Sequence, residues 1–118
     1  MMMARNWVAA APIVLLLLPS SASAELTGLD RLHAQARVGN KICMVRHEHY
    51  GEGSMPTRRA AELMAIRSWS GFTAFEYGRP WGNYRLAAGR KMECSESGGR
   101  WVCKTSARPC RPANLRVR

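Results

Sequence analysis

Acidic residues are scarce in this chain of 118 residues, which has 8 Asp and Glu against 18 Lys and Arg. They are scattered singly, so no pair of carboxylates is placed for general acid–base work. The chain also lacks a Ser-His-Asp order and a glycine-rich phosphate loop. These absences argue against the common hydrolase and nucleotide-binding classes, and we assign no catalytic residue and no cofactor.

Long apolar runs are absent too, except at the N-terminus. There residues 7–18 form a short apolar run after a basic start, and residues 19–24 end in a small-x-small pattern. This order is typical of a secretory signal peptide over residues 1–24, with cleavage expected after Ala24. A retained anchor is the minor alternative, because the run is short and contains Pro12. We therefore expect an exported protein, periplasmic or extracellular, which is not an integral membrane protein after cleavage.

The excess of basic residues favours an anionic partner. The formal net charge is +10, and +9 without residues 1–24, because Arg5 is the only charged residue removed. Such a balance suits nucleic acid, anionic lipid headgroups or acidic envelope polymers, of which nucleic acid is the least accessible to an exported protein. The first hypothesis is therefore a non-enzymatic binding or structural module that contacts an anionic envelope component; simple solubility is the alternative. Its candidate ligand-binding residues are Arg100, Lys104, Arg108, Arg111, Arg116 and Arg118.

Four cysteines lie beyond the predicted signal peptide, and none of their spacings gives the Cys-x₂₋₄-Cys pair of a zinc site. An even number in a small exported domain indicates two disulfides. A Gly-Gly hairpin turn at 98–99 places Cys94 opposite Cys103 as a non-hydrogen-bonded pair, in which the Cα atoms approach most closely. Cys43 then pairs with Cys110. The rival arrangement, Cys43 with Cys94 and Cys103 with Cys110, stays open.

The order of the patterned segments predicts an α+β domain over residues 41–110. We expect one long helix packed on a small antiparallel sheet in β-α-β-β order, stapled by two disulfides. The expected first strand is 41–50 and the expected loop is 51–56. A connector, 81–96, runs into the second strand, and 101–107 is the third.

The helix is expected to begin after Thr57 as N-cap and to end near Tyr77, before Gly78. Two segments flank the domain. Residues 25–40 are a lead-in arm or a short helix, with Thr27 and Asp30 as a capping box and Gly39-Asn40 as its end. Residues 111–118 are a basic tail.

The predicted helix carries apolar residues on two sides. One arc of the helical wheel is expected to face the core, and it holds Ala60, Ala61, Met64, Ala65, Ser68, Gly71, Phe72 and Phe75. The opposite side holds Leu63, Ile66, Trp69 and Tyr77. Either the lead-in or the region of Trp81 covers this second side, or it is a surface for homo-oligomerisation through Leu63, Ile66 and Trp69.

Two histidines form the one local cluster with metal-ligand chemistry. On a strand, His47 and His49 point to the same side and can share a Cu²⁺, Ni²⁺ or Zn²⁺ ion. A third ligand would have to come from His33 or Glu52. The alternative is a pair of partly exposed histidines with no function.

The same histidines allow a second chemical hypothesis, a small secreted phosphodiester hydrolase. One imidazole would act as the base and the other as the acid, beside a cation from Lys41, Arg46 or the basic tail. Nothing in the spacing of these residues requires that chemistry.

From Thr57 onward the chain resembles a group of small exported bacterial proteins of unknown function, over about half of its length. The matching residues are Ala60-Ala61, Ala65-Ile66-Arg67-Ser68-Trp69, Phe75-Glu76-Tyr77-Gly78, Trp81, Ala87, Met92, Cys94, Gly98-Gly99, Trp101, Cys103 and Ala107-Arg108-Pro109-Cys110. The resemblance implies signal-directed export and a helix followed by a hairpin. It implies no activity, and Cys43 lies outside it.

Overall fold

The computed structural model describes residues 3–4, 6–17 and 26–115. The two N-terminal segments contain neither helix nor strand. Across the described ranges, no helix is long and apolar enough to cross a membrane. The predicted cleavage after Ala24, and the candidate ligand-binding residues Arg116 and Arg118, lie outside the described residues.

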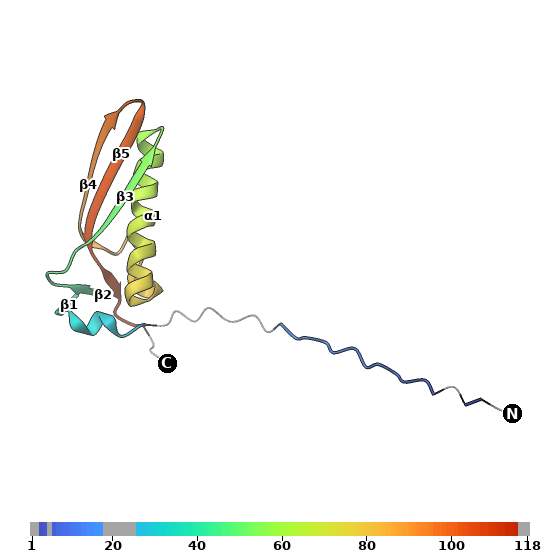
Figure 1. Cartoon of the computed structure of the whole chain (residues 1–118). Coiled ribbons are helices and arrows are strands. Elements are labelled where there is room, and N and C mark those ends of the chain that lie inside the picture. Colours follow the sequence, from blue (N-terminus) through green and yellow to red (C-terminus); the bar gives the residue numbers. More distant parts are fainter. Residues whose placement is uncertain (1–2, 5, 18–25, 116–118) are drawn as a thin grey trace.

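The regular elements form two small sheets and one long helix. In chain order they are η1 (Leu29–Leu32), β1 (Gln35–Val38), β2 (Lys41–Met44), β3 (His49–Met55), α1 (Arg58–Tyr77), η2 (Arg79–Trp81), β4 (Ala88–Ser97), β5 (Arg100–Arg108) and β6 (Cys110–Pro112). The antiparallel sheets have the strand orders β3-β5-β4 and β1-β2-β6, and α1 packs along the first of them (Figure 1). The α+β class is confirmed. The expectation of a single sheet is wrong, because the chain divides its strands between two.

Helix α1 has the ends that the sequence predicts. The Thr57 hydroxyl oxygen accepts a hydrogen bond from the Ala60 N–H (3.2 Å), which satisfies a free donor of the first turn. Gly78 ends the helix at a φ of 106°, a conformation that strongly favours glycine. These caps are local, so the sequence alone places the helix correctly.

Helix α1 lies close to β3 because two glycines of that strand face it. A Cβ atom at Gly51 would lie 2.6 Å from the Trp69 nitrogen, and one at Gly53 would lie 2.7 Å from the Ala65 nitrogen. The predicted loop over 51–56 is therefore wrong for residues 51–55. The glycines there permit a close helix–strand contact rather than a turn.

The core-facing side of α1 differs from the expected arc. The buried residues follow an i, i+4 row, and they are Ala61, Ala65, Trp69, Thr73 and Tyr77. Phe72 and Phe75 were expected in the core but are 52% and 85% exposed. An i, i+4 row is inclined to the helix axis, whereas the expected arc ran parallel to it.

The buried row also changes the proposed oligomer surface. Trp69 is fully buried and its indole N–H donates to the Ala107 carbonyl (3.2 Å). It packs in a cluster with Ala87, Ala107 and Tyr84. A self-association surface that includes Trp69 is therefore wrong, while Leu63 remains 49% exposed.

The β4–β5 hairpin has the predicted register. Ser97 pairs with Arg100 across the Gly98-Gly99 turn, and Cys94 faces Cys103. Disulfides join Cys94 to Cys103 and Cys43 to Cys110. The predicted pairing is confirmed, which excludes the rival arrangement.

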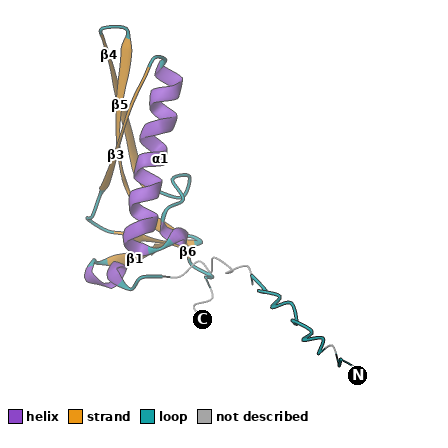
Figure 2. Cartoon of the chain, turned by 45° about the vertical axis from the view of Figure 1, so that its right-hand side comes forward, coloured by secondary structure: helices purple, strands orange, loops and turns teal. Residues whose placement is uncertain are grey.

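The predicted strand 41–50 is in fact two strands in different sheets. Strand β2 pairs with β6, whereas β3 begins at His49 and pairs with β5. The chain passes from one sheet to the other a second time at Pro109, between β5 and β6. The Pro109 carbonyl accepts a hydrogen bond from the Met44 N–H (2.9 Å). Figure 2 shows β1 and β6 at the lower end of α1 and the β3-β5-β4 sheet alongside the helix.

The segment before β2 is also more ordered than expected. Gly39 (φ 58°) and Asn40 form the turn of a β1–β2 hairpin and do not end a helix. The predicted capping box is wrong, because Gly28 is the N-cap of η1 and the Asp30 carboxylate accepts from Gln35. At the other end, the start of the predicted basic tail belongs to β6.

Candidate functional site

The three histidines of the chain meet at one place. His33 follows η1, His47 lies in the connection between the sheets, and His49 opens β3. The rings of His33 and His47 stack with centroids 3.9 Å apart, and the centroids of His47 and His49 are 5.0 Å apart. We call these three residues the histidine cluster.

His49 is the centre of the cluster and is 3% exposed. Its Nε2 atom lies 3.1 Å from His47 Nε2, 3.2 Å from the Tyr77 hydroxyl and 3.2 Å from Glu76 Oε2. Glu76 and Tyr77 come from the last turn of α1. The end of the helix thus completes a site that the β2–β3 connection begins.

Thr73 determines which nitrogen of His49 carries the proton. The Thr73 hydroxyl donates to the Trp69 carbonyl (2.7 Å), so its oxygen can only accept from His49 Nδ1, which is 2.9 Å away. The neutral His49 ring is therefore protonated at Nδ1. Its Nε2 lone pair points at the side chains of His47, Glu76 and Tyr77.

The environment opposes protonation of two histidines of the cluster, His49 and His47. The pKa of His49 is lowered to about 4, mainly by burial; the Glu76 carboxylate opposes the shift, and the nearby His47 and His33 add to it. Burial, and then His33, also lower the pKa of His47. Burial and the Glu76 carboxylate raise the pKa of Tyr77, which remains a protonated phenol.

The contact between His49 and Glu76 brings two electron-rich atoms together. At neutral pH the Nε2 lone pair of His49 faces the Glu76 carboxylate at 3.2 Å without a proton of its own between them. The Tyr77 hydroxyl, 3.2 Å from Nε2, can donate a hydrogen bond at this contact, and a bound cation would be attracted to both electron-rich atoms. The 3.1 Å between the Nε2 atoms of His47 and His49 is a hydrogen-bond distance. It is also close to the separation of two ligands of one ion, because nitrogens about 2.1 Å from an ion lie about 3.0 Å apart at a right angle and about 3.4 Å apart at the tetrahedral angle.

A complete set of three ligands requires one side chain to turn. Within residues 26–115, three His, Cys, Asp or Glu ligand atoms lie within 4.8 Å of one another only at Glu62, Cys94 and Cys103. In the histidine cluster, His47 Nε2 and Glu76 Oε2 each lie close to His49 Nε2, but the three atoms do not all lie within 4.8 Å of one another. The Glu76 side chain, which is 31% exposed, would have to rotate for its carboxylate to reach both histidines.

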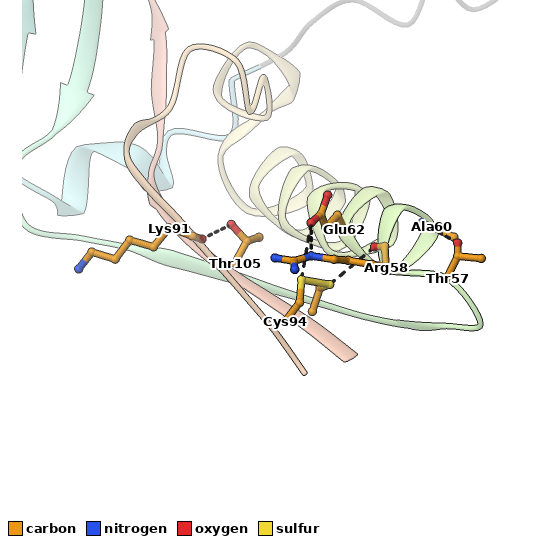
Figure 3. Close-up of a disulfide and its surroundings, with 8 residues drawn as sticks. Thr57, Arg58, Ala60, Glu62, Lys91, Cys94 and Thr105 are labelled. Carbon is orange, nitrogen blue, oxygen red and sulfur yellow. Dashed lines mark hydrogen bonds and ion pairs between the residues drawn. A yellow bond between two sulfur atoms is a disulfide. The ribbon is translucent and has the colours of Figure 1, made fainter. Parts of the chain in front are cut away.

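The Glu62 group does not form a metal site in the oxidised protein. Figure 3 shows Glu62 and Arg58 reaching from the helix over the disulfide of the hairpin. Glu62 Oε1 lies 3.9 Å from Cys94 Sγ and accepts a hydrogen bond from Arg58 Nε (3.1 Å). Because the two sulfurs are bonded to each other, neither is a thiolate ligand.

The structure does not bring the candidate anion-binding residues together. Arg100 and Arg108 lie at opposite ends of β5, about 26 Å apart along the strand. Arg100 donates to the Ser54 carbonyl (2.8 Å). Lys104 lies in register between Glu52 and Glu93.

Two more of the candidate anion-binding residues, Arg108 and Arg111, lie where the two sheets meet. Arg108 donates to the carbonyls of Met44 and Val45 (3.1 and 3.3 Å). The Arg111 guanidinium lies 5.6 Å from the centre of the Trp81 ring. Both therefore make contacts within the protein.

The structure does bring predicted metal ligands together. His47 and His49 are adjacent, and His33, one of the two suggested third ligands, is in the cluster. Glu52, the other, alternates with the helix-facing glycines of β3 and so lies on the opposite face of the sheet. Lys41, suggested as the cation of a hydrolase, donates to the Leu86 carbonyl (2.8 Å).

Sequence reasoning missed Thr73, Glu76 and Tyr77. Their spacing of three and four residues indicates one side of a helix. That signal does not show that this side ends beside His49, since the contact depends on how β3 and α1 pack.

Comparison with protein-family models, curated proteins and solved structures finds no match. The resemblance to small exported bacterial proteins therefore stays a prediction.

Proposed function

We propose that this protein binds a divalent transition-metal ion through His47 and His49, with Glu76 as the third ligand. The observation that carries the proposal is the position of His49 Nε2, 3.1 Å from His47 Nε2 and 3.2 Å from Glu76 Oε2. Imidazole and carboxylate together suit Zn²⁺ and Cu²⁺. Thr73 supports the site by keeping the Nδ1 proton on His49, so that Nε2 is the free ligand atom.

We also propose that the protein works outside the cytoplasm. Two disulfides fit an oxidising compartment, and the N-terminal sequence pattern predicts export. A thiol-free histidine and carboxylate site suits that compartment, because oxidation of cysteine does not affect it.

Calorimetric titration of the metal-free protein with Zn²⁺ and with Cu²⁺ tests the metal site. We expect one ion per chain, and loss of this binding in a His47→Ala/His49→Ala variant. Titration heats that do not exceed those of the double variant would reject the proposal.

Two single variants assign the third ligand. Glu76→Gln removes the carboxylate charge and is expected to weaken binding at least tenfold. His33→Ala removes the ring that stacks on His47 and is expected to change the affinity less than threefold. The opposite ranking would make His33 the ligand.

Contact with an anionic envelope component remains a second proposal. It rests on the formal charge of +10 and on the exposure of Arg100 and Lys104. Binding of the mature protein to an acidic polymer should weaken steeply with salt. An affinity that does not change with salt would reject it.

A further inference from the structure

One end of the molecule combines exposed aliphatic side chains with exposed arginines. Leu29 and Leu32 are 47% and 78% exposed. Both belong to η1, and residues three apart in a 3₁₀-helix lie on the same side. They therefore form an apolar strip that nothing in residues 26–115 covers.

The segment between the sheets adds to this strip. The Val45 N–H donates to the Ala34 carbonyl (2.9 Å), and the His33 ring stacks on His47. Residues 32–34 thus run alongside residues 45–47, so Val45, 39% exposed, lies near η1. Figure 1 shows η1, β1 and β2 together at the end of the molecule opposite the β4–β5 turn.

The charges at this end are almost all positive. Arg31, Arg37 and Arg46 are exposed. Asp30 is the only acidic residue between positions 29 and 47, and it is 6% exposed and accepts a hydrogen bond from Gln35. Glu48, the next residue, and Glu76, beside His49, are only partly exposed, so the fully exposed charges at this end are those of the arginines.

We infer that this end, which we call the η1 face, docks on the surface of an anionic phospholipid bilayer. Leu29 and Leu32 enter the boundary between headgroups and acyl chains, while Arg31 and Arg46 contact the lipid phosphates. A soluble acidic polymer would use the arginines but gain nothing from two exposed leucines. The inference is independent of the proposed metal site.

Sedimentation of the mature protein with phosphatidylglycerol–phosphatidylcholine vesicles tests the inference, with pure phosphatidylcholine vesicles as the neutral control. We expect binding to the anionic vesicles only, weakening as salt is raised. Leu29→Ser/Leu32→Ser should weaken binding about tenfold, since it removes the inserted apolar area. Arg31→Ala/Arg46→Ala should weaken it about 25-fold.

The matched control is Arg59→Ala/Arg67→Ala, which removes the same charge from exposed positions of α1, at a distance from the η1 face. It should change binding by less than about twofold. The inference is overturned by absent binding, by equal binding to neutral vesicles, or by a greater loss in this control. Unchanged binding of the leucine variant would also overturn it and would identify a soluble polyanion as the partner. All substitutions are at exposed positions, and circular dichroism checks that each variant is folded.

Discussion

Thr73 controls the chemistry of the site although it is not one of the proposed ligands. Its hydroxyl is fixed as a donor to the Trp69 carbonyl, which makes it an acceptor for His49 Nδ1–H. Without that acceptor the imidazole can move its proton to Nε2, where the ion would bind. The tautomer of His49 therefore depends on the helix that packs against it.

Substitution of Thr73 tests this dependence. Thr73→Val keeps the shape of the side chain but removes the acceptor, and we expect Zn²⁺ affinity to fall about tenfold. Thr73→Ser retains the hydroxyl and should bind within about threefold of the wild type. Calorimetry gives the affinities, and nitrogen NMR shifts of the imidazole report the tautomer. Equal affinities in both variants would show that Thr73 only fills space.

The lowered pKa of His49 makes the stability of the metal-free protein depend on pH. The unfolded chain takes up a proton near pH 6.5, whereas folded His49 does so only near pH 4. Between these values the unfolded state binds more protons, so stability falls as pH is lowered from 6.5 to 4. The loss reaches about 3 kcal/mol.

Urea unfolding across this pH range measures the effect. A His49→Gln variant has no imidazole at this position, so its free energy of unfolding should vary less with pH. Parallel pH profiles for the two proteins would contradict the assignment of the shift to His49.

The contact between α1 and β3 is the element on which the site depends. Gly51 and Gly53 allow the helix to lie close enough for Thr73, Glu76 and Tyr77 to reach His49. We expect Gly51→Ala to cost about 3 kcal/mol, because its Cβ would lie 2.6 Å from the Trp69 nitrogen.

Gly71 provides the matched comparison for Gly51. It is an exposed residue of α1 and has nothing within 4 Å of its Cβ position, so Gly71→Ala should stabilise the protein by about 1 kcal/mol. Thermal unfolding with the disulfides intact measures both variants. A stabilising Gly51→Ala would show that α1 can move away from β3 without cost.

The elements that the sequence predicts correctly are those with local determinants. Thr57 and Gly78 define the ends of α1, and the Gly98-Gly99 turn defines the register that pairs Cys94 with Cys103. In each case the residues that determine the structure are close together in the chain. Local physical rules are therefore sufficient.

The wrong predictions concern contacts between distant segments. The chain leaves one sheet after Met44 because β2 pairs with β6, whose residues come more than sixty positions later. The glycines of β3 are turn signals in the sequence and close-contact positions in the fold. The same limit applies to the site, since the His-x-His pair is visible but its partners on α1 are not.

At the scale of the whole molecule, the two disulfides constrain very different lengths of chain. Cys43–Cys110 spans 67 positions and Cys94–Cys103 spans 9. In the loop-entropy account, removing the long crosslink costs about 4 kcal/mol and removing the short one about 3 kcal/mol. Either loss is a large part of the stability of a small domain.

Paired alanine substitutions measure this difference. Urea unfolding should show Cys43→Ala/Cys110→Ala to be the less stable of the two double variants. Greater damage from Cys94→Ala/Cys103→Ala would mean that the hairpin depends on its crosslink beyond the entropy of the loop.

The β1-β2-β6 sheet takes its first two strands from the start of the domain and its third from the end. During synthesis from the N-terminus, β1 and β2 are available early, yet Cys43 must wait for Cys110 while Cys94 and Cys103 emerge before it. Closure of the short hairpin loop is fast compared with a search over 67 positions. Early oxidation of the hairpin thus removes both competing thiols and leaves Cys43 and Cys110 to pair with each other.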